Sequence, residues 1–268
     1  RFVDCNESGN ISIDDLKKRI AKKTKAIVVV HLYGNPADVV GVQKFLRTLH
    51  RRDIKIIEDC AQAHGATINK RKVGTFGDIG IYSFYPSKNL GAYGDGGMVV
   101  TKNKIVADRV RALRMYGENK RYETKEVSGV SRLDELQAAI LRVKLRHLSA
   151  WNDRRRIIAQ QYTKALGSMK NCTVTPYVIG ACYHLFVIRT NRRDELKMYL
   201  EKEGIGCAVH YPIPLHLTKP GVALGYHRGD FPMAEKLSKE ILSLPIYPEL
   251  SDINIVRISK SIVRFFSL

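Results

Sequence analysis

The N-terminal half of the chain alternates between apolar runs of strand length and segments with helical periodicity. KAIVVVHLYG (25–34) and IKIIED (54–59) are dominated by apolar residues, as strands buried on both faces of a parallel sheet usually are. Between them, VVGVQKFLRTLHRR (39–52) carries apolar residues at helical spacing. We expect further strands at 79–85 and 96–102 and a helix at 105–117. This alternation predicts an α/β fold with a mostly parallel mixed sheet sandwiched by helices.

The pattern changes in the C-terminal half. Residues from Leu133 to about Met169 read as a long helical stretch, either continuous or with a break near Ser149 and Ala150, and such a stretch suggests a connection between two lobes. After it we expect a strand at 183–190 and a strand running into a loop at 207–214. We also expect helices at 193–204, 231–242 and 253–266. We therefore expect a large domain over 1–130, a connecting helix over 131–170 and a smaller α+β domain over 171–268.

Composition narrows the class of protein. Of the 268 residues 44% are hydrophobic, enough to bury a core, and no apolar run has the length needed to cross a bilayer. The five cysteines are odd in number and widely spaced, without a C-x-x-C pair. This spacing argues against a disulfide framework and a structural metal site and favours a reducing cytoplasm, so we expect a cytoplasmic protein without a metal or a membrane anchor.

The net charge of +19 is unusual, and much of it lies in short runs such as KKRIAKKTK (17–25) and RRR (154–156). Each run is most simply a solvated helix face or turn. Together they would also attract a polyanion, either nucleic acid or a substrate that carries a diphosphate. No nucleic-acid-binding motif accompanies the charge, so we do not expect nucleic acid as a partner.

Reactive and polar side chains follow the predicted strands where those strands end. The strand at 54–59 ends in Asp59, with Gln62 close behind, and the strand at 79–85 carries Ser83 and leads to Lys88. Ligands of open α/β sheets bind at the carboxyl ends of strands, so these groups should converge. Each has an ordinary explanation alone, as a cap, a hydrogen-bonding group or a solvated lysine. Together they suit pyridoxal phosphate, which needs a lysine amine for a Schiff base and an aspartate for its pyridine nitrogen.

Several longer segments resemble one enzyme family. The chain resembles the sugar aminotransferases named after DegT, DnrJ, EryC1 and StrS. The resemblance is carried by five segments: EDCAQAHGA (58–66), GDIGIYSFYPSKNLGAYGDGG (77–97), SRLDELQAAIL (131–141), HYPIPLHL (210–217) and GDFPMAEKLSKEILSLPIYPEL (229–250). The resemblance runs from near residue 1 to the C-terminus. It implies the pyridoxal-phosphate transferase fold of type I and a homodimer with sites at the subunit interface. The implied reaction moves an amino group from glutamate to a keto-sugar linked to a nucleotide diphosphate.

The resemblance also implies roles for single residues. Lys88 would form the Schiff base with pyridoxal phosphate and later move a proton, and Asp59 would pair with the pyridine nitrogen. Gln62 would lie near the ring hydroxyl, and Ser83 would hold the phosphate. His210, Tyr211 and His216 match a loop near the sugar in the family, although a proline-rich turn between domains explains them equally well.

The sequence departs from the family pattern in two places. Family members carry a phosphate-binding turn and a ring-stacking aromatic before the point that corresponds to residue 1, and Val130 stands where the family usually has an asparagine. We therefore expect an incomplete phosphate site in a free-standing chain. Three alternatives follow from this: a non-catalytic relative, a dehydratase-like relative, and a basic polyanion-binding protein on the same scaffold. The dehydratase branch replaces the lysine by histidine, so Lys88 favours transamination.

Overall fold

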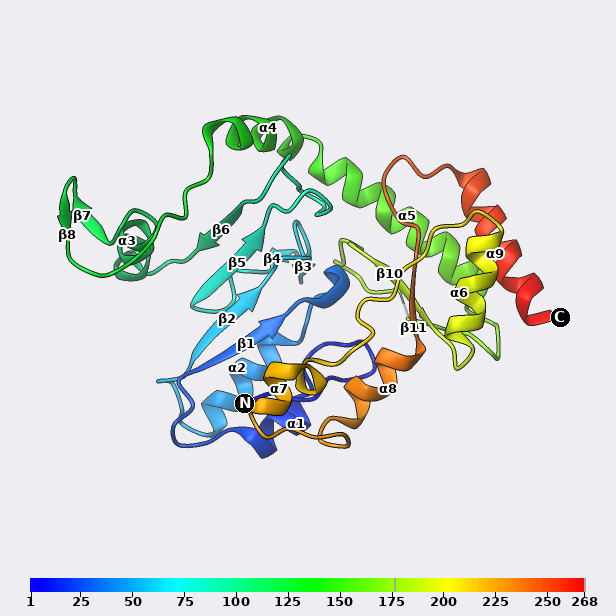
Figure 1. Cartoon of the computed structure of the whole chain (residues 1–268), viewed down its shortest axis with the longest axis horizontal. Coiled ribbons are helices and arrows are strands. Elements are labelled where there is room, and N and C mark those ends of the chain that lie inside the picture. Colours follow the sequence, from blue (N-terminus) through cyan, green and yellow to red (C-terminus); the bar gives the residue numbers. More distant parts are fainter. Residues whose placement is uncertain (176, 268) are drawn as a thin grey trace.

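The larger part of the molecule is built on a mixed sheet. The computed structural model describes residues 1–175 and 177–267. Strands β1 (Ala26–Val30), β2 (Lys55–Asp59), β5 (Ile79–Ser83) and β6 (Gly97–Val100) lie in the order β1-β2-β5-β6. The first three are parallel and β6 is antiparallel to β5, as Figure 1 shows. The predicted α/β fold with a mostly parallel mixed sheet is confirmed.

Two capped helices cover one face of β1 and β2. Helix α1 (Ile13–Arg19) begins after Ser12, whose hydroxyl accepts a hydrogen bond from the Asp15 N–H. Helix α2 (Val39–Thr48) begins after Asp38, whose carboxylate accepts a hydrogen bond from the Gly41 N–H. Their apolar stripes pack on the inward side chains of the two strands to form one core (Leu16, Ile27, Val29, Val39, Val42, Leu46, Ile54 and Ile56). This packing fixes where β1 and β2 end, and therefore where Asp59 lies.

The expectation that 25–34 is a strand buried on both faces is wrong. The strand ends at Val30 and a 3₁₀ turn, η1 (Leu32–Gly34), follows. Within β1, Ile27 and Val29 are buried, whereas Val28 is 52% exposed and Val30 is 37% exposed. A continuous apolar run does not reveal whether both faces of a strand are covered, and among the described residues only one face of β1 is.

Shorter elements complete the large domain. They are the hairpin of β3 (Thr67–Ile68) and β4 (Arg71–Lys72), helix α3 (Lys104–Leu113), and the hairpin of β7 (Glu118–Lys120) and β8 (Glu123–Thr124). Figure 1 shows α3 and the β7–β8 hairpin together at the β6 side of the molecule. The long helical stretch expected over 131–170 is two helices, α4 (Glu135–Leu145) and α5 (Leu148–Leu166), which are separated at Arg146 and His147.

The C-terminal part is a small antiparallel sheet with helices against it. Strands β9 (Thr173–Val174), β10 (Phe186–Arg189) and β11 (Ile241–Leu244) lie in the order β11-β10-β9. Helices α5, α6 (Arg193–Lys202) and α9 (Asp252–Ser267) contribute to its core, in which Ile158, Leu196 and Ile262 are fully buried. This arrangement agrees with the smaller α+β unit expected from the sequence.

Two boundaries in this part differ from the expected ones. The helix expected over 231–242 is α8 (Pro232–Glu240) followed at once by strand β11, because Ile241 and Leu242 pair with β10. The strand expected within 207–214 is a single bridge between Ala208 and Ser243. The loop after it holds η2 (Leu215–Leu217) and α7 (Lys219–Ala223). Of the helices in the described part of the chain, none is both long and apolar enough to cross a membrane.

Candidate active site

The ends of β2 and β5 bring the sequence-predicted residues to one edge of the sheet. Asp59 is the last residue of β2 and pairs in register with Ile81 of β5, and Ser83 is the last residue of β5. Lys88 lies in the loop after β5, close enough to Asp59 for the carboxylate to act on the charge of the ammonium group. The parallel pairing of β2 with β5 therefore places a carboxylate, a hydroxyl and an amine at the same rim.

The loop that carries Lys88 is held tightly on both sides of the lysine. The Lys88 N–H donates to the Tyr85 carbonyl over 2.9 Å, and the Ala92 N–H donates to the Phe84 carbonyl over 2.8 Å. A Cβ at position 91 would lie 2.3 Å from the Pro86 carbonyl oxygen, so only glycine fits at Gly91. The glycine-rich sequence after the lysine thus allows the backbone to fold back on itself and fixes the base of the side chain.

The environment of Lys88 favours the neutral amine. Burial lowers the pKa of the half-buried Lys88 ammonium, and the negative charge of Asp59 only partly opposes this shift. A lysine with a lowered pKa is a better nucleophile and base near neutral pH than a solvated one. This is the direction of shift that Schiff-base chemistry requires.

Asp59 and Ser83 each keep hydrogen-bonding capacity that the described residues do not use. One oxygen of Asp59, Oδ1, accepts a hydrogen bond from the Ala61 N–H over 2.9 Å, and within the described residues Oδ2 accepts none. The hydroxyl oxygen of Ser83 accepts from the Tyr85 N–H over 3.3 Å, which leaves its proton available to donate. Both side chains are therefore anchored and still able to bind a ligand.

Gln62 connects the sheet edge to the small domain. Its Oε1 accepts from the Tyr33 N–H over 2.6 Å, and its Nε2 donates to the Tyr211 hydroxyl over 3.3 Å. The Tyr33 hydroxyl donates to the His210 carbonyl over 2.5 Å, and the His210 ring is hydrogen-bonded to Ser243 Oγ at 2.9 Å. Gln62, His210 and Tyr211 thus lie together. Tyr33, which the sequence placed only at the end of a strand, joins them.

A buried polar cluster that the sequence did not reveal supports the lysine loop. Asn89, next to Lys88, donates to Asn152 Oδ1 and to the Cys182 carbonyl, both at 2.9 Å, and its Oδ1 lies 3.2 Å from His184 Nδ1. Burial, aided by the charge of Lys88, lowers the pKa of His184 to about 3, so the ring is neutral at physiological pH. The only sequence signal for this cluster was the position of Asn89 directly after the lysine.

Two other residues from the sequence analysis have different surroundings. His216 is buried, its Nε2 lies 2.9 Å from Glu235 Oε1, and its ring packs against Phe231. A role for His216 at the sugar stays a prediction. Val130 is half-exposed and forms a bridge with Met115.

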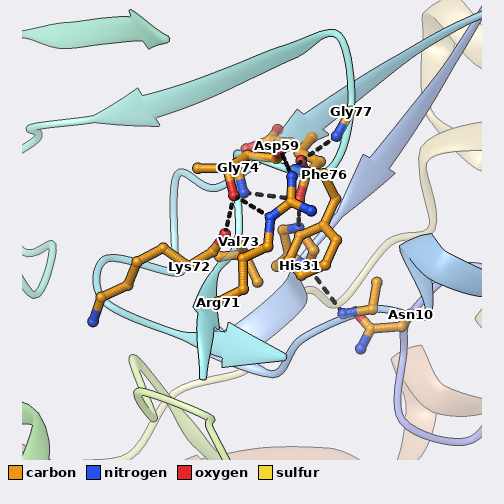
Figure 2. A network of polar contacts seen from close by, with 12 residues as sticks. Asn10, His31, Asp59, Arg71, Lys72, Val73, Gly74, Phe76 and Gly77 are labelled. Atoms are coloured by element: carbon orange, nitrogen blue, oxygen red, sulfur yellow. Dashed lines mark hydrogen bonds and ion pairs between the residues drawn. The ribbon is translucent and has the colours of Figure 1, made fainter. Parts of the chain in front are cut away.

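His31, Glu58 and Cys60 lie close enough together to suggest a metal site. Figure 2 shows instead a closed hydrogen-bond network in which His31, Gly74, Phe76 and Gly77 surround one carboxylate. The Glu58 oxygens accept from the N–H groups of Phe76 and Gly77 at 2.6 Å, of Gly74 at 2.8 Å and from His31 Nε2 at 3.1 Å. His31 Nδ1 accepts from the Ala37 N–H. These hydrogen bonds occupy the lone pairs of His31 and Glu58, so both side chains serve the fold as the structure describes them.

The donor set at the sheet edge suits pyridoxal phosphate. The cofactor needs an amine with a lowered pKa, a carboxylate for its ring nitrogen, and polar groups for its ring hydroxyl and phosphate. Lys88, Asp59, Gln62 and Ser83 supply these four kinds of group at one rim, and Asp59 Oδ2 is free to accept. The residues present therefore fit this cofactor.

Comparison with known proteins gives the same family that the motifs resemble. A model of the DegT/DnrJ/EryC1/StrS aminotransferase family matches residues 1–263. The chain belongs to this family. The structure of this chain superposes on that of Streptomyces venezuelae DesV with a TM-score of 0.93, and the two sequences are 37% identical. The match covers 98% of this chain and 71% of the DesV chain. The type I transferase fold expected from the sequence is confirmed.

Curated relatives from several organisms are 42% to 44% identical to this family member over the aligned residues. The dTDP-3-amino-3,4,6-trideoxy-alpha-D-glucose transaminase of Streptomyces venezuelae is 42% identical over 88% of the chain. The UDP-N-acetyl-3-dehydro-alpha-D-glucosamine 3-aminotransferase of Acidithiobacillus ferrooxidans is 44% identical over 98%, and the pleiotropic regulatory protein of Geobacillus stearothermophilus is 42% identical over 99%. The chain spans 62%, 70% and 72% of the lengths of these three relatives.

Proposed function

We propose that this family member is a pyridoxal-phosphate-dependent aminotransferase that acts on a keto-sugar linked to a nucleotide diphosphate. One observation carries the proposal: a half-buried lysine with a lowered pKa lies beside a partly free aspartate at the carboxyl ends of two parallel strands. The named sugar transaminases among its relatives support the reaction class. The same lysine favours transamination over the dehydratase alternative.

Four residues would hold the cofactor. Lys88 would bind it covalently, Asp59 would accept a hydrogen bond from its ring nitrogen, Gln62 would lie at its ring hydroxyl, and Ser83 would donate to its phosphate. When bound, pyridoxal phosphate supplies an electron sink for the carbon that loses or gains a proton. The chain contributes the position of these groups and their charge.

Lys88 and Asp59 divide the proton chemistry. Burial lowers the pKa of Lys88, which makes its Nζ a better base near neutral pH than a solvated lysine, and Nζ would take the proton from the substrate carbon and return it later. Asp59 is anchored by the Ala61 N–H, and its carboxylate would keep a proton on the ring nitrogen of the bound cofactor. The neutral His184 and the fixed Asn89 keep the lysine loop in place without adding charge near the amine.

The substrate side of the proposal rests on the small domain. His210 and Tyr211 lie next to Gln62, so a sugar bound beside the cofactor would contact this loop. A nucleotide diphosphate also suits a chain with a net charge of +19. We further propose glutamate as the amino donor, a homodimer as the working form and the cytoplasm as its location.

A spectral titration tests this function. The purified chain with pyridoxal phosphate should develop an absorbance band near about 420 nm, and Lys88→Ala should lack it while Lys44→Ala, an exposed lysine on α2, retains it. Adding L-glutamate should bleach the band and release 2-oxoglutarate. A wild-type chain that stays colourless with the cofactor, or two variants that behave alike, would overturn the proposal.

A further inference from the structure

Two of the basic runs in the sequence meet at one edge of the sheet. The run at 22–25 leads into β1, and the run at 50–52 leads into β2. Arg51 joins them, because its guanidinium donates to the carbonyl oxygens of Ala21 over 3.2 Å and of Thr24 over 3.0 Å. Positive charge that is separate in the sequence is therefore gathered in one place.

The cations at this edge are exposed, and the acid in the turn before β2 is already used by Arg51. Both oxygens of Asp53 accept hydrogen bonds from the Arg51 guanidinium, at 2.8 and 2.9 Å. These bonds lower the pKa of Asp53, and the charge of Lys25 contributes to the same shift, so Lys25 lies within reach of this turn. Five other exposed side chains form no ion pair with an acid in the described part of the chain, and we name them the basic edge: Lys22, Lys23, Lys25, Arg47 and Arg52.

The basic edge lies at the opposite ends of the strands from the candidate active site. Asp59 is the last residue of β2, whereas the basic edge precedes its first residue, Lys55, and the arrow of β2 in Figure 1 runs from one end to the other. Four residue steps of about 3.3 Å separate the two ends by roughly 13 Å. Surface charges are largely screened beyond about 8 Å at physiological ionic strength, so these cations contribute little to the binding of an anion beside Lys88. A nucleotide diphosphate at the candidate active site therefore does not account for the basic edge.

An apolar side chain is exposed among these charges. Leu49 follows the last turn of α2, lies in the sequence between Arg47 and Arg52, and is 42% exposed. The segments that carry the basic edge, 21–25 and 47–53, contain no phenylalanine, tyrosine or tryptophan on which a nucleic-acid base could stack. Cations beside an exposed leucine suit the surface of an anionic bilayer, where the cations meet the headgroups and the leucine enters the boundary of the acyl chains.

We propose that the basic edge binds the surface of a membrane that contains anionic phospholipids. Its five cations contact the phosphate groups, and Leu49 inserts between the headgroups. The contact is peripheral and reversible, and it requires no membrane-spanning helix. The end of the sheet that carries Asp59 and Lys88 then faces away from the bilayer, so substrates reach it from solution. This interaction needs no cofactor and does not depend on the proposed function.

Co-sedimentation with lipid vesicles tests the proposal. The chain is mixed with vesicles of phosphatidylcholine alone, or of phosphatidylcholine and phosphatidylglycerol at a ratio of about two to one. We expect binding to the mixed vesicles only, and weaker binding as the salt concentration rises. Lys22→Ala combined with Lys23→Ala should weaken binding by roughly twentyfold, because each cation near an anionic bilayer strengthens binding roughly fivefold.

A matched control removes the same charge elsewhere. Lys164→Ala combined with Lys260→Ala changes two exposed lysines on α5 and α9, in the small domain, and should leave vesicle binding as it is in the wild type. Lys22→Arg combined with Lys23→Arg keeps the charge at the basic edge and should also preserve binding. Circular dichroism verifies that each variant folds.

A last comparison separates a lipid surface from another polyanion. Leu49→Ser should weaken binding to the mixed vesicles several-fold and should not change binding to a DNA duplex. Equal binding to both kinds of vesicle, an equal loss in the Lys164 and Lys260 control, or full vesicle binding by Leu49→Ser would overturn the proposal. So would a DNA duplex that binds through Lys22 and Lys23 more tightly than the mixed vesicles at the same concentration of phosphate groups, because the partner would then be a nucleic acid.

Discussion

Replacing Glu58 by glutamine should destabilise the large domain strongly without touching the cofactor residues. The Glu58 side chain is fully buried, and its two oxygens accept four hydrogen bonds, three from the 74–77 loop and one from His31. Glutamine has nearly the same shape, but its amide nitrogen donates and does not accept. Two of the four donors would therefore face another donor.

The size of the effect follows from those two lost partners. A buried donor left without an acceptor costs about 1–3 kcal/mol, so Glu58→Gln should lower the free energy of unfolding by about 2–6 kcal/mol. Domains of this kind are stable by roughly 5–15 kcal/mol in total, so such a loss is readily measured. Urea unfolding followed by circular dichroism provides the measurement, and Asp53→Asn, at an exposed acid on the surface, serves as the control.

The same carboxylate predicts a pH dependence. Burial alone would raise the pKa of Glu58, but hydrogen bonds from His31 and from the backbone of Gly77 and Gly74 outweigh it and hold the pKa below its ordinary value. Its contribution is therefore present above the unfolded-state pKa of about 4.3 and is lost as the pH falls through the lower folded-state pKa. Glu58→Gln should remove that part of the acid sensitivity. A urea midpoint that is the same in the variant and the wild type would show that these hydrogen bonds do not stabilise the domain.

Three further substitutions have defined outcomes. Gly91→Ala places a Cβ against the Pro86 carbonyl, so the lysine loop must shift. Spectral titration should then show that pyridoxal phosphate binds more weakly by roughly tenfold or more, whereas the circular dichroism spectrum should not change. Arg155→Met removes the donor to three buried backbone carbonyls and should cost about 3 kcal/mol in urea unfolding, whereas an unaltered midpoint would contradict it. Tyr33→Phe removes the hydrogen bond to the His210 carbonyl and should cost about 1 kcal/mol, with the same assay as the check.

The sequence predicted the structure best where an apolar run of strand length ends next to reactive or polar side chains. Strands β2 and β5 and the residues at their ends, Asp59, Ser83 and Lys88, were predictable because apolar runs end there in polar or proline-containing turns. Strand β11 was not, because ILSL continues the apolar pattern of α8 and becomes a strand only by pairing with β10.

Other features depend on contacts between distant parts of the chain. The cluster that holds the lysine loop joins Asn89 to Asn152 and His184, and no local pattern links these positions. The role of Glu58 depends in the same way on His31 and on the 74–77 loop. The exposed face of β1 was missed because an apolar run indicates a strand and not what covers it.

Mapping the lysine that binds pyridoxal phosphate covalently decides whether Lys88 is the cofactor lysine. The chain is incubated with pyridoxal phosphate, reduced with borohydride, digested and analysed by mass spectrometry. We expect the added mass on the peptide that contains Lys88, because its lowered pKa and its position beside Asp59 select it among the lysines of a very basic chain. Label spread over exposed lysines such as Lys22 and Lys44, or no label on the Lys88 peptide, would contradict it.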